Sequence, residues 1–381
     1  MRHQPVTSNA WRIALVLVGT VIGAGFASGA EIMAYFTSYG EAGMWSIGAA
    51  GLLFYMGTYG TLRIAYEHGN TEYGTFTETI AGKWLGALLD ALVTLSMLLG
   101  YGVMLAGSGA IFVQQWNLPS VLGALIMAAG TCLALQFGPQ GIMAVNRILT
   151  PILIIGIFLL SVYSIVTSIS ITETSGLLLQ PLSIFTAQPV DGLPQALGSA
   201  VVYASYNMLG AGAVLAGLSG YVGSRRTAVL AGVYATVILV VLTLVLGLAT
   251  FLNYDTIIEI PIPALALLQK HAFWQRVYVG VLLGAMYTTA VADGFGFANR
   301  MQALLPVHRG WIFLGMTAAA LLLARVGFAD LVAKGYRFFG YLGIGQLLLI
   351  MVKCIPKKEE NIHGKQKRRN RHSEKLVGNR R

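Results

Sequence analysis

Three acidic residues, Glu31, Asp90 and Asp293, lie inside long apolar stretches of the sequence. A charged side chain at the centre of a bilayer costs about 3 kcal/mol, so such residues usually serve in binding, ion movement or a buried pair. We expect Glu31 and Asp293 to have a binding or coupling role. Asp90 follows Lys83 by seven residues, and its alternative is a structural pair with a basic residue.

The segment 19–31, GTVIGAGFASGAE, is rich in glycine. Each glycine inside a helix costs about 1 kcal/mol relative to alanine, so this density favours a local break. A break within the bilayer is tolerated where the freed backbone groups line a cavity or bind a ligand. The glycines of the segment are Gly19, Gly23, Gly25 and Gly29.

Ser28 and Glu31 have the Ser-x-x-Glu spacing of a helix-capping box, which predicts that a second half-helix begins there. The alternative is that glycines four residues apart, such as Gly19 and Gly23, form a packing face for a neighbouring helix. A carboxylate in the first turn of a half-helix is also stabilised by the helix dipole, which would give Glu31 a structural role.

The composition is typical of a membrane protein, because 56% of the 381 residues are hydrophobic and 10% are charged, with a mean hydropathy of +0.70. Soluble domains carry about 25% charged residues. A helix that crosses a bilayer needs about 20 apolar residues. Ten stretches are long enough, at about 11–36, 43–65, 85–112, 119–137, 141–169, 194–217, 227–252, 276–299, 310–328 and 331–353.

The basic residues predict the orientation of these helices. Twenty of the 25 lysine and arginine residues fall on the side that holds the N-terminus, and eleven of them lie in 353–381. The positive-inside rule therefore predicts a multi-pass protein of the bacterial inner membrane with both termini in the cytoplasm. The predicted parts are a cytoplasmic N-terminus (1–10), a five-helix repeat (11–169), an external linker (170–193), a second five-helix repeat (194–353) and a basic cytoplasmic tail (354–381).

An odd number of helices in each half gives the halves opposite orientations, the inverted-repeat arrangement of many secondary transporters. In such chains, discontinuous helices at corresponding places in the two halves mark a central site. The sixth stretch contains 205–212, SYNMLGAG, near its middle. We therefore expect a second helix break beside Ser205, Asn207 and Gly210.

Two connecting segments carry helical patterns of their own. In 71–84, Thr75 and Glu78 have the spacing of a capping box, which predicts a short helix at the membrane surface. The segment 253–273 contains IPIP followed by ALALLQKHAF. It predicts either a helical hairpin over an outer vestibule or a surface loop with one helical turn.

Several function classes lack their signatures. The two cysteines, Cys132 and Cys354, support neither a disulfide framework nor a metal site. The sequence contains no HExxH, no Gly-x-Ser-x-Gly and no Cys/His cluster, so we expect the protein not to be an enzyme. The basic charge is concentrated in the tail, which indicates contact with anionic lipid rather than with nucleic acid.

The segment GTVIGAGFASGAEI resembles the first-helix signature of the YkvI-like bacterial membrane proteins, within the amino acid–polyamine–organocation transporter superfamily. The resemblance covers most of 11–353. It implies an all-α, LeuT-like core of about ten transmembrane helices in a 5+5 inverted repeat, with helices 1 and 6 discontinuous. The substrate would lie between these two helices, and the resemblance implies no particular substrate.

In the LeuT-like fold, hydroxyl groups of helix 8 and carbonyls of helix 1 form a cation site. By that resemblance Thr288 and Thr289 would coordinate sodium, or Asp293 would carry a proton in its place. The alternative is hydrogen bonding of the threonines to the preceding turn and pairing of Asp293 with an arginine. The residues assigned to cation or proton coupling are Gly19, Ile22, Thr288, Thr289, Asp293 and Asp90.

The resulting hypothesis is a secondary active transporter of a small polar organic solute, an amino acid or an amine, that works by alternating access. An ionised Glu31 would repel an anionic ligand, so either Glu31 is protonated or the ligand presents an amine. No cofactor is expected besides Na⁺ or H⁺ as the coupling ion. The alternative is a receptor that kept the fold and binds a ligand without transport. The assigned substrate-binding residues are Gly23, Ala24, Gly25, Ser28, Glu31, Ser205, Asn207, Gly210, Tyr101 and Tyr287.

Overall fold

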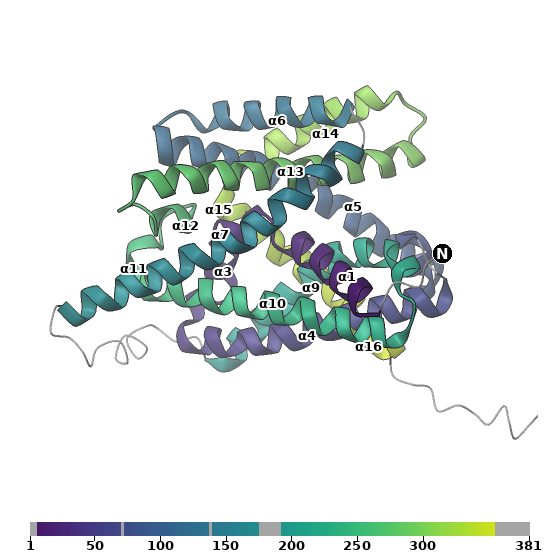
Figure 1. Ribbon diagram of the computed structural model, residues 1–381. Coiled ribbons are helices and arrows are strands. Elements are labelled where there is room, and N and C mark those ends of the chain that lie inside the picture. Colours follow the sequence, from purple (N-terminus) through teal and green to yellow (C-terminus); the bar gives the residue numbers. More distant parts are fainter. Residues whose placement is uncertain (1–5, 70–71, 137–138, 175–191, 355–381) are drawn as a thin grey trace, which may run out of the picture.

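The computed structural model describes residues 6–69, 72–136, 139–174 and 192–354, and every regular element in these ranges is a helix (Figure 1). Most of the predicted external linker and of the basic tail lies outside the described residues. The helices are α1 (Val6–Val21), α2 (Ala24–Ala27), α3 (Ala30–Tyr35), η1 (Thr37–Tyr39), α4 (Gly40–His68), α5 (Tyr73–Trp116), α6 (Ser120–Gln136), α7 (Pro139–Thr174), α9 (Leu193–Gly217), η2 (Ser219–Tyr221), α10 (Arg225–Leu252), α11 (Tyr254–Ile257), α12 (Pro263–Ala266), α13 (Ala272–Leu304), α14 (Arg309–Ala324), α15 (Phe328–Asp330), η3 (Leu331–Tyr336) and α16 (Arg337–Cys354).

Each of the ten predicted apolar stretches contains a helix. Six helical segments of the described chain are long and apolar enough to cross a membrane. They are Tyr73–Trp116, Leu149–Ile169, Leu193–Gly217, Arg225–Leu252, Ala272–Gln302 and Phe328–Cys354. Three shorter apolar helices, α1, α6 and α14, and the 29-residue α4 occupy the other predicted stretches. The all-helical membrane class is therefore confirmed, whereas the number of crossings stays a prediction.

The helices pack in two groups, with the short helices α2 and α3 between them. In one group α4 packs on α9 and α10, and α9 also packs on α16. In the other, α5 packs on α13, α6 and α14. Figure 1 shows α6, α13 and α14 along one side of the molecule and α4, α10 and α16 along the other. Between the groups, α2 contacts α13, whereas α3 contacts α9, α10 and η3.

One end of the bundle gathers the N-terminal part of α1, the C-terminus of α16 and several basic side chains. Arg63 donates to the Cys354 carbonyl at 3.0 Å, and Lys353 donates to the Thr79 carbonyl at 2.6 Å. Glu67 of α4 forms ion pairs with Arg63 and with Arg225 of α10. This is the end that the charge bias predicts to face the cytoplasm.

The two connecting segments are partly as predicted. Residues 73–81 form a short helix, separated from the rest of α5 by Gly82 at φ 77° and ψ 176°. The capping box at Thr75 is wrong, because Glu72 is the N-cap residue and the Thr75 hydroxyl donates to the Glu72 carbonyl from within the helix. In 253–273, the short helices α11 and α12 form in place of a plain loop.

Candidate functional site

The first predicted span is broken twice. The Gly23 N–H bonds to the Val21 carbonyl at 2.9 Å, so α1 cannot continue, and Gly23 itself is extended at φ −83° and ψ −174°. The four-residue α2 then ends at Ser28, and Gly29 turns the chain into α3 with φ 80°. The prediction of a discontinuous first helix is confirmed. Because a helix leaves its last carbonyls without intrahelical donors, the break exposes polar backbone inside the bundle.

Ser28 holds the second turn together through three hydrogen bonds. Its hydroxyl donates to the Gly25 carbonyl at 2.8 Å and accepts from the Ala30 N–H at 3.3 Å. Its own carbonyl accepts from the Ala264 N–H at 2.9 Å. The predicted capping box is wrong, because Gly29 is the N-cap residue of α3 and the Ser28 hydroxyl accepts from the Ala30 N–H rather than from the Glu31 N–H. The Ser28 hydroxyl is thus occupied by backbone.

Short helix α12 and long helix α13 cover this turn. Pro263 lies 3.4 Å from the position that a Cβ on Gly29 would occupy, and the Tyr278 hydroxyl donates to the Ala27 carbonyl at 2.6 Å. The Gln114 amide donates to the Ile262 carbonyl at 3.2 Å and connects the cover to α5. The segment 253–273 therefore packs over one side of the broken helix.

We expect Gly29→Ala to lower the thermal unfolding midpoint of the purified protein. An L-residue in the left-handed region costs about 1–2 kcal/mol, and the new Cβ would also contact Pro263. The matched control is Gly198→Ala, within α9, where nothing lies within 4 Å of the added Cβ. That change should keep or raise the midpoint, because alanine is favoured in a helix. Equal midpoints for the two variants would contradict a strained turn at Gly29.

Glu31, in the first turn of α3, is buried with 4% of its surface exposed. Its Oε2 atom has no hydrogen-bond partner among the residues that the structure describes. The carboxylate lies directly on the backbone of α2, since a Cβ added to Gly25 would overlap Glu31 Oε1. Glycine is required at position 25 for this close approach. The alternative in which the glycines form a packing face for a neighbouring helix does not predict this contact.

Two buried tyrosines stand beside Glu31. The rings of Tyr35 and Tyr203 have centroids 5.1 Å apart, and neither hydroxyl has a partner among the described residues. The Glu31 carboxylate lies close enough to act electrostatically on both hydroxyls. Three polar atoms at the α3–α9 interface, Glu31 Oε2 and the two hydroxyl oxygens, therefore have no partner in the part of the protein that the structure describes.

The predicted break in the sixth span is wrong, because α9 is one continuous helix from Leu193 to Gly217. Asn207 donates to the Tyr203 carbonyl one turn earlier at 3.1 Å, so its side chain does not interrupt the helix. Ser205 packs its backbone against Gly343 of α16, and Gly210 has open space where a side chain would point. One glycine and one asparagine do not outweigh the helix-forming residues around them.

Helix α13 faces the first break. The Thr289 hydroxyl lies 3.9 Å from the position that a Cβ on Gly23 would take, whereas the Thr288 hydroxyl donates back to the Ala285 carbonyl at 3.0 Å. Asp293 follows Thr289 by one turn and lies against Gly100 of α5. It remains partly accessible, and it has no ion pair among the side chains that the structure describes.

A stacked pair of tyrosines lies between the two acids. The rings of Tyr206, on α9, and Tyr336, at the end of η3, have centroids 4.2 Å apart with an interplanar angle of 18°. Glu31 and Asp293 both act electrostatically on these two hydroxyls. Analysis of the sequence missed the pair, although Tyr206 lies between two residues that it selected, Ser205 and Asn207.

Tyr336 is placed by a π-helical segment that no sequence pattern indicated, the six residues of η3. A widened turn of this kind is frequent at functional sites. The next residue, Arg337, donates to the Ala34 carbonyl at 2.7 Å and lies 5.5 Å from the Tyr35 ring centroid. The Arg337 guanidinium is therefore bound beside the site by α3.

Two assigned tyrosines contact helices α6 and α14. The Tyr101 hydroxyl pairs with Thr317 of α14 at 3.3 Å, and the Tyr287 ring packs 3.4 Å from the position of a Cβ on Gly130 of α6. Tyr101 therefore contacts α14 and Tyr287 contacts α6, and their assignment to the substrate site stays a prediction. Gly19 packs closely on Thr150 of α7.

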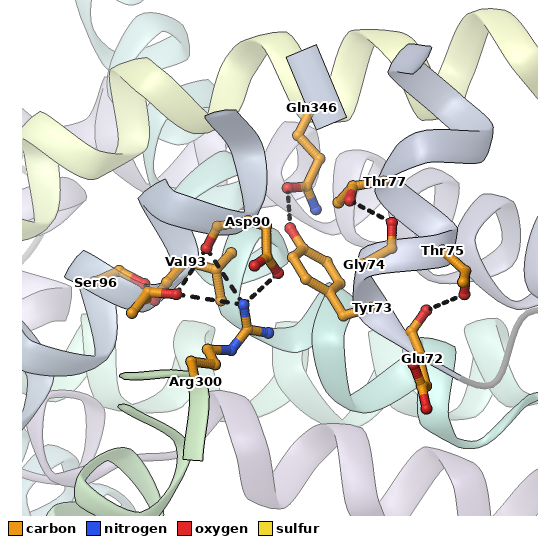
Figure 2. A network of polar contacts seen from close by, with 11 residues as sticks. Glu72, Tyr73, Gly74, Thr75, Thr77, Asp90, Val93, Ser96, Arg300 and Gln346 are labelled. Carbon is orange, nitrogen blue, oxygen red and sulfur yellow. Dashed lines mark hydrogen bonds and ion pairs between the residues drawn. The ribbon is translucent and has the colours of Figure 1, made fainter. Parts of the chain in front are cut away.

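Asp90 belongs to a polar network at the basic end of the bundle (Figure 2). Arg300 of α13 forms an ion pair with Asp90 and lies 5.4 Å from the Tyr73 ring centroid. The Tyr73 hydroxyl donates to Gln346 Oε1 at 2.6 Å, and Gln346 Nε2 donates to the Met208 carbonyl at 3.4 Å. The network links α5, α9, α13 and α16, which supports the structural alternative for Asp90.

We expect Tyr73→Phe to destabilise the protein by about 1–3 kcal/mol, because the change leaves the buried Gln346 oxygen without its donor. The measurement is the thermal unfolding midpoint in detergent. Tyr66→Phe is the matched control, since the Tyr66 hydroxyl makes one exposed bond to the Gly223 carbonyl at 3.4 Å. If both variants lose the same stability, the Tyr73–Gln346 bond contributes nothing specific.

Comparisons with known proteins agree with this architecture. No protein-family model matches the chain. It is 26% identical over 361 residues to the membrane protein YkvI of Bacillus subtilis, covering 92% of this chain and 97% of YkvI. It is also 26% identical over 352 residues to YyaD of the same organism, covering 90% of this chain and 96% of YyaD.

Solved structures with a similar fold are transporters. The inward-facing conformation of Mhp1 has a TM-score of 0.60 at 13% identity, covering 89% of this chain and 75% of Mhp1. The Eremococcus coleocola manganese transporter has a TM-score of 0.59 at 14% identity, covering 91% of this chain and 78% of the transporter. MhsT in complex with L-phenylalanine has a TM-score of 0.57 at 15% identity, covering 92% of this chain and 82% of MhsT. The chain is therefore a homologue of the Bacillus subtilis proteins YkvI and YyaD, built on the LeuT fold.

Proposed function

We propose that the protein is a secondary active transporter of a small organic solute that carries an amine, either an amine or an amino acid. The observation that supports it most directly is the break at Gly23, opposite Thr289 and Asp293, in a chain with a transporter fold. Backbone freed inside a membrane bundle is tolerated where it lines a cavity or binds a ligand.

In this proposal the solute lies beside Gly23 and Ala24, between the stacked tyrosines and α13. Asp293 is the partly accessible acid, so it receives the amine. The faces of Tyr206 and Tyr336 favour a cation, because an aromatic ring attracts positive charge. Thr289, beside the break, is the hydroxyl best placed to complete a sodium site with the carbonyls of Gly19, in the last turn of α1, and of Ile22, which follows that helix.

The test is uptake into proteoliposomes. The purified protein is first screened for thermal stabilisation by amino acids and amines, with and without sodium, because a ligand that binds the native state raises its stability. Each stabilising solute is then offered to proteoliposomes under a proton or a sodium gradient. Gradient-driven accumulation of an amine-bearing solute is the expected result. Stabilisation without any uptake would contradict transport and favour the receptor.

We further propose that the protein lies in the bacterial inner membrane with its basic end in the cytoplasm. In intact cells, an impermeant maleimide should label Ser120→Cys, at the start of α6, but not Thr75→Cys, in the short helix before Gly82. Both positions are exposed, and both variants are made with Cys132 and Cys354 replaced by serine. Labelling of position 75 from outside would reverse the orientation.

A further inference from the structure

The α3–α9 interface contains a group of buried polar atoms that the proposed substrate contacts leave unused. They are Glu31 Oε2 and the hydroxyl oxygens of Tyr35 and Tyr203, all without a hydrogen-bond partner in the described part of the chain. The three side chains are at most 4% exposed. Buried polar atoms in native proteins are rarely left unsatisfied, and ordered water is their usual partner where protein groups are absent.

No cation in the described chain neutralises Glu31. The guanidinium group of Arg337, which lies beside the neighbouring Tyr35 ring, is held by the Ala34 carbonyl. An ionised carboxylate without a paired cation is unstable in such surroundings, whereas the neutral acid is not. The titratable groups around Glu31 are Tyr35 on its own helix, Tyr203 and Tyr206 of α9, Tyr336 of η3 and, farther away, Asp293 of α13 and Arg337 of α16. Helix α10 contacts Ile32 through Gly247 and Thr37 through Thr250, and none of these four residues titrates.

We propose that Glu31, together with Tyr35 and Tyr203, forms a hydrated proton-binding site, in which Glu31 is protonated in this conformation and releases its proton when α3 separates from α9. Release breaks the carboxyl O–H bond, leaves the electron pair on the carboxylate and transfers the proton to water. The two hydroxyl groups then donate to the carboxylate, directly or through water.

The site is mechanically connected to the substrate region through Gly25. Because Glu31 Oε1 occupies the place of a side chain on Gly25, a shift of α2 moves the carboxyl group. The same four-residue helix begins at Gly23, beside Thr289. Proton binding and substrate binding thus act on opposite faces of one short helix. This connection to transport rests on the proposed function, whereas proton binding at Glu31 does not.

The proton-binding site is tested by infrared difference spectroscopy of the full-length protein in lipid nanodiscs, without substrate, as the pH is raised from about 5 to about 9. A carboxylic acid C=O band should disappear on titration in the wild type and in Asp293→Asn, and it should be absent at every pH in Glu31→Gln. Glu31→Asp, which keeps the acid, should shift the band and so guards against misfolding of the glutamine variant.

Three results would overturn this assignment. The first is that the band persists in Glu31→Gln, and the second is that no acid band titrates in both the wild type and Asp293→Asn. The third is that sodium chloride removes the band at constant pH whereas choline chloride does not. The last result would make the site one for an alkali cation. Absence of uptake in proteoliposomes would overturn the transport function without affecting any of these spectra.

Discussion

Gly25→Leu is expected to reduce substrate affinity by roughly 100-fold or more, which corresponds to about 3 kcal/mol of overpacking. The first atom of the new side chain would already overlap the Glu31 carboxylate, so leucine must expel that group or push α2 into the region beside Gly23. The measurement is the loss of thermal stabilisation by the solute found in the uptake screen, together with initial uptake rates.

The control for this substitution is Gly48→Leu, which makes the same change on the outward face of α4, where nothing lies within 4 Å of the added Cβ. It should keep affinity and uptake. Circular dichroism and size-exclusion profiles show whether each variant is folded. Unchanged affinity in folded Gly25→Leu would contradict a binding region on the Gly23 side of α2.

Asp293→Asn is expected to weaken binding of an amine-bearing solute by about 10- to 100-fold, because a hydrogen bond to a charged group contributes about 1.5–3 kcal/mol. Asp293 is partly accessible and is not paired with a cation among the described side chains, so its charge is available to a ligand. The expected change is in affinity, measured by the substrate concentration needed for half-maximal uptake.

Two variants frame that result. Asp255→Asn removes an exposed acid at α11 and should leave the uptake curve unchanged. Glu31→Gln should leave binding measurable but remove the dependence of uptake on the proton gradient. A normal uptake curve for Asp293→Asn would exclude this acid from binding, and Thr289 would be the next residue to test.

These roles reverse the ones that the sequence suggested. Position along the chain placed Glu31 beside the substrate and Asp293 in ion coupling. We propose the opposite assignment, because Glu31 is buried beside Tyr35 and Tyr203 whereas Asp293 is not fully covered. Solvent access depends on which residues of other helices surround a side chain, and no local pattern contains that information.

The break in the first helix was predictable because its cause is local: four glycines weaken thirteen residues of helix. Continuity of α9 was not recognised because Asn207 can bond to its own helix as readily as interrupt it. The direction of the Tyr101 side chain has a geometric cause. Successive residues of a helix point about 100° apart, so when Gly100 faces Asp293, Tyr101 is turned towards α14.

Tyr336 and Arg337 were unpredictable for a different reason. They are placed by the π-helix η3, in which each backbone hydrogen bond spans one residue more than in an α-helix. The apolar periodicity of the sequence does not indicate this change. An arginine near the end of an apolar stretch reads as the boundary of a span. Its bond to the Ala34 carbonyl, 303 positions away in sequence, depends wholly on the packing of α3 against η3.

The hydrogen bond between the Ala264 N–H and the Ser28 carbonyl has a consequence for comparisons among relatives. Both atoms belong to the main chain, so this bond attaches the cover formed by α12 to the broken helix whatever side chains the two residues carry. Homologues with quite different residues at both positions can keep the same attachment, provided that position 264 is not proline, which lacks the donor. Divergence in this loop therefore says little about whether the cover and the broken helix move as one piece.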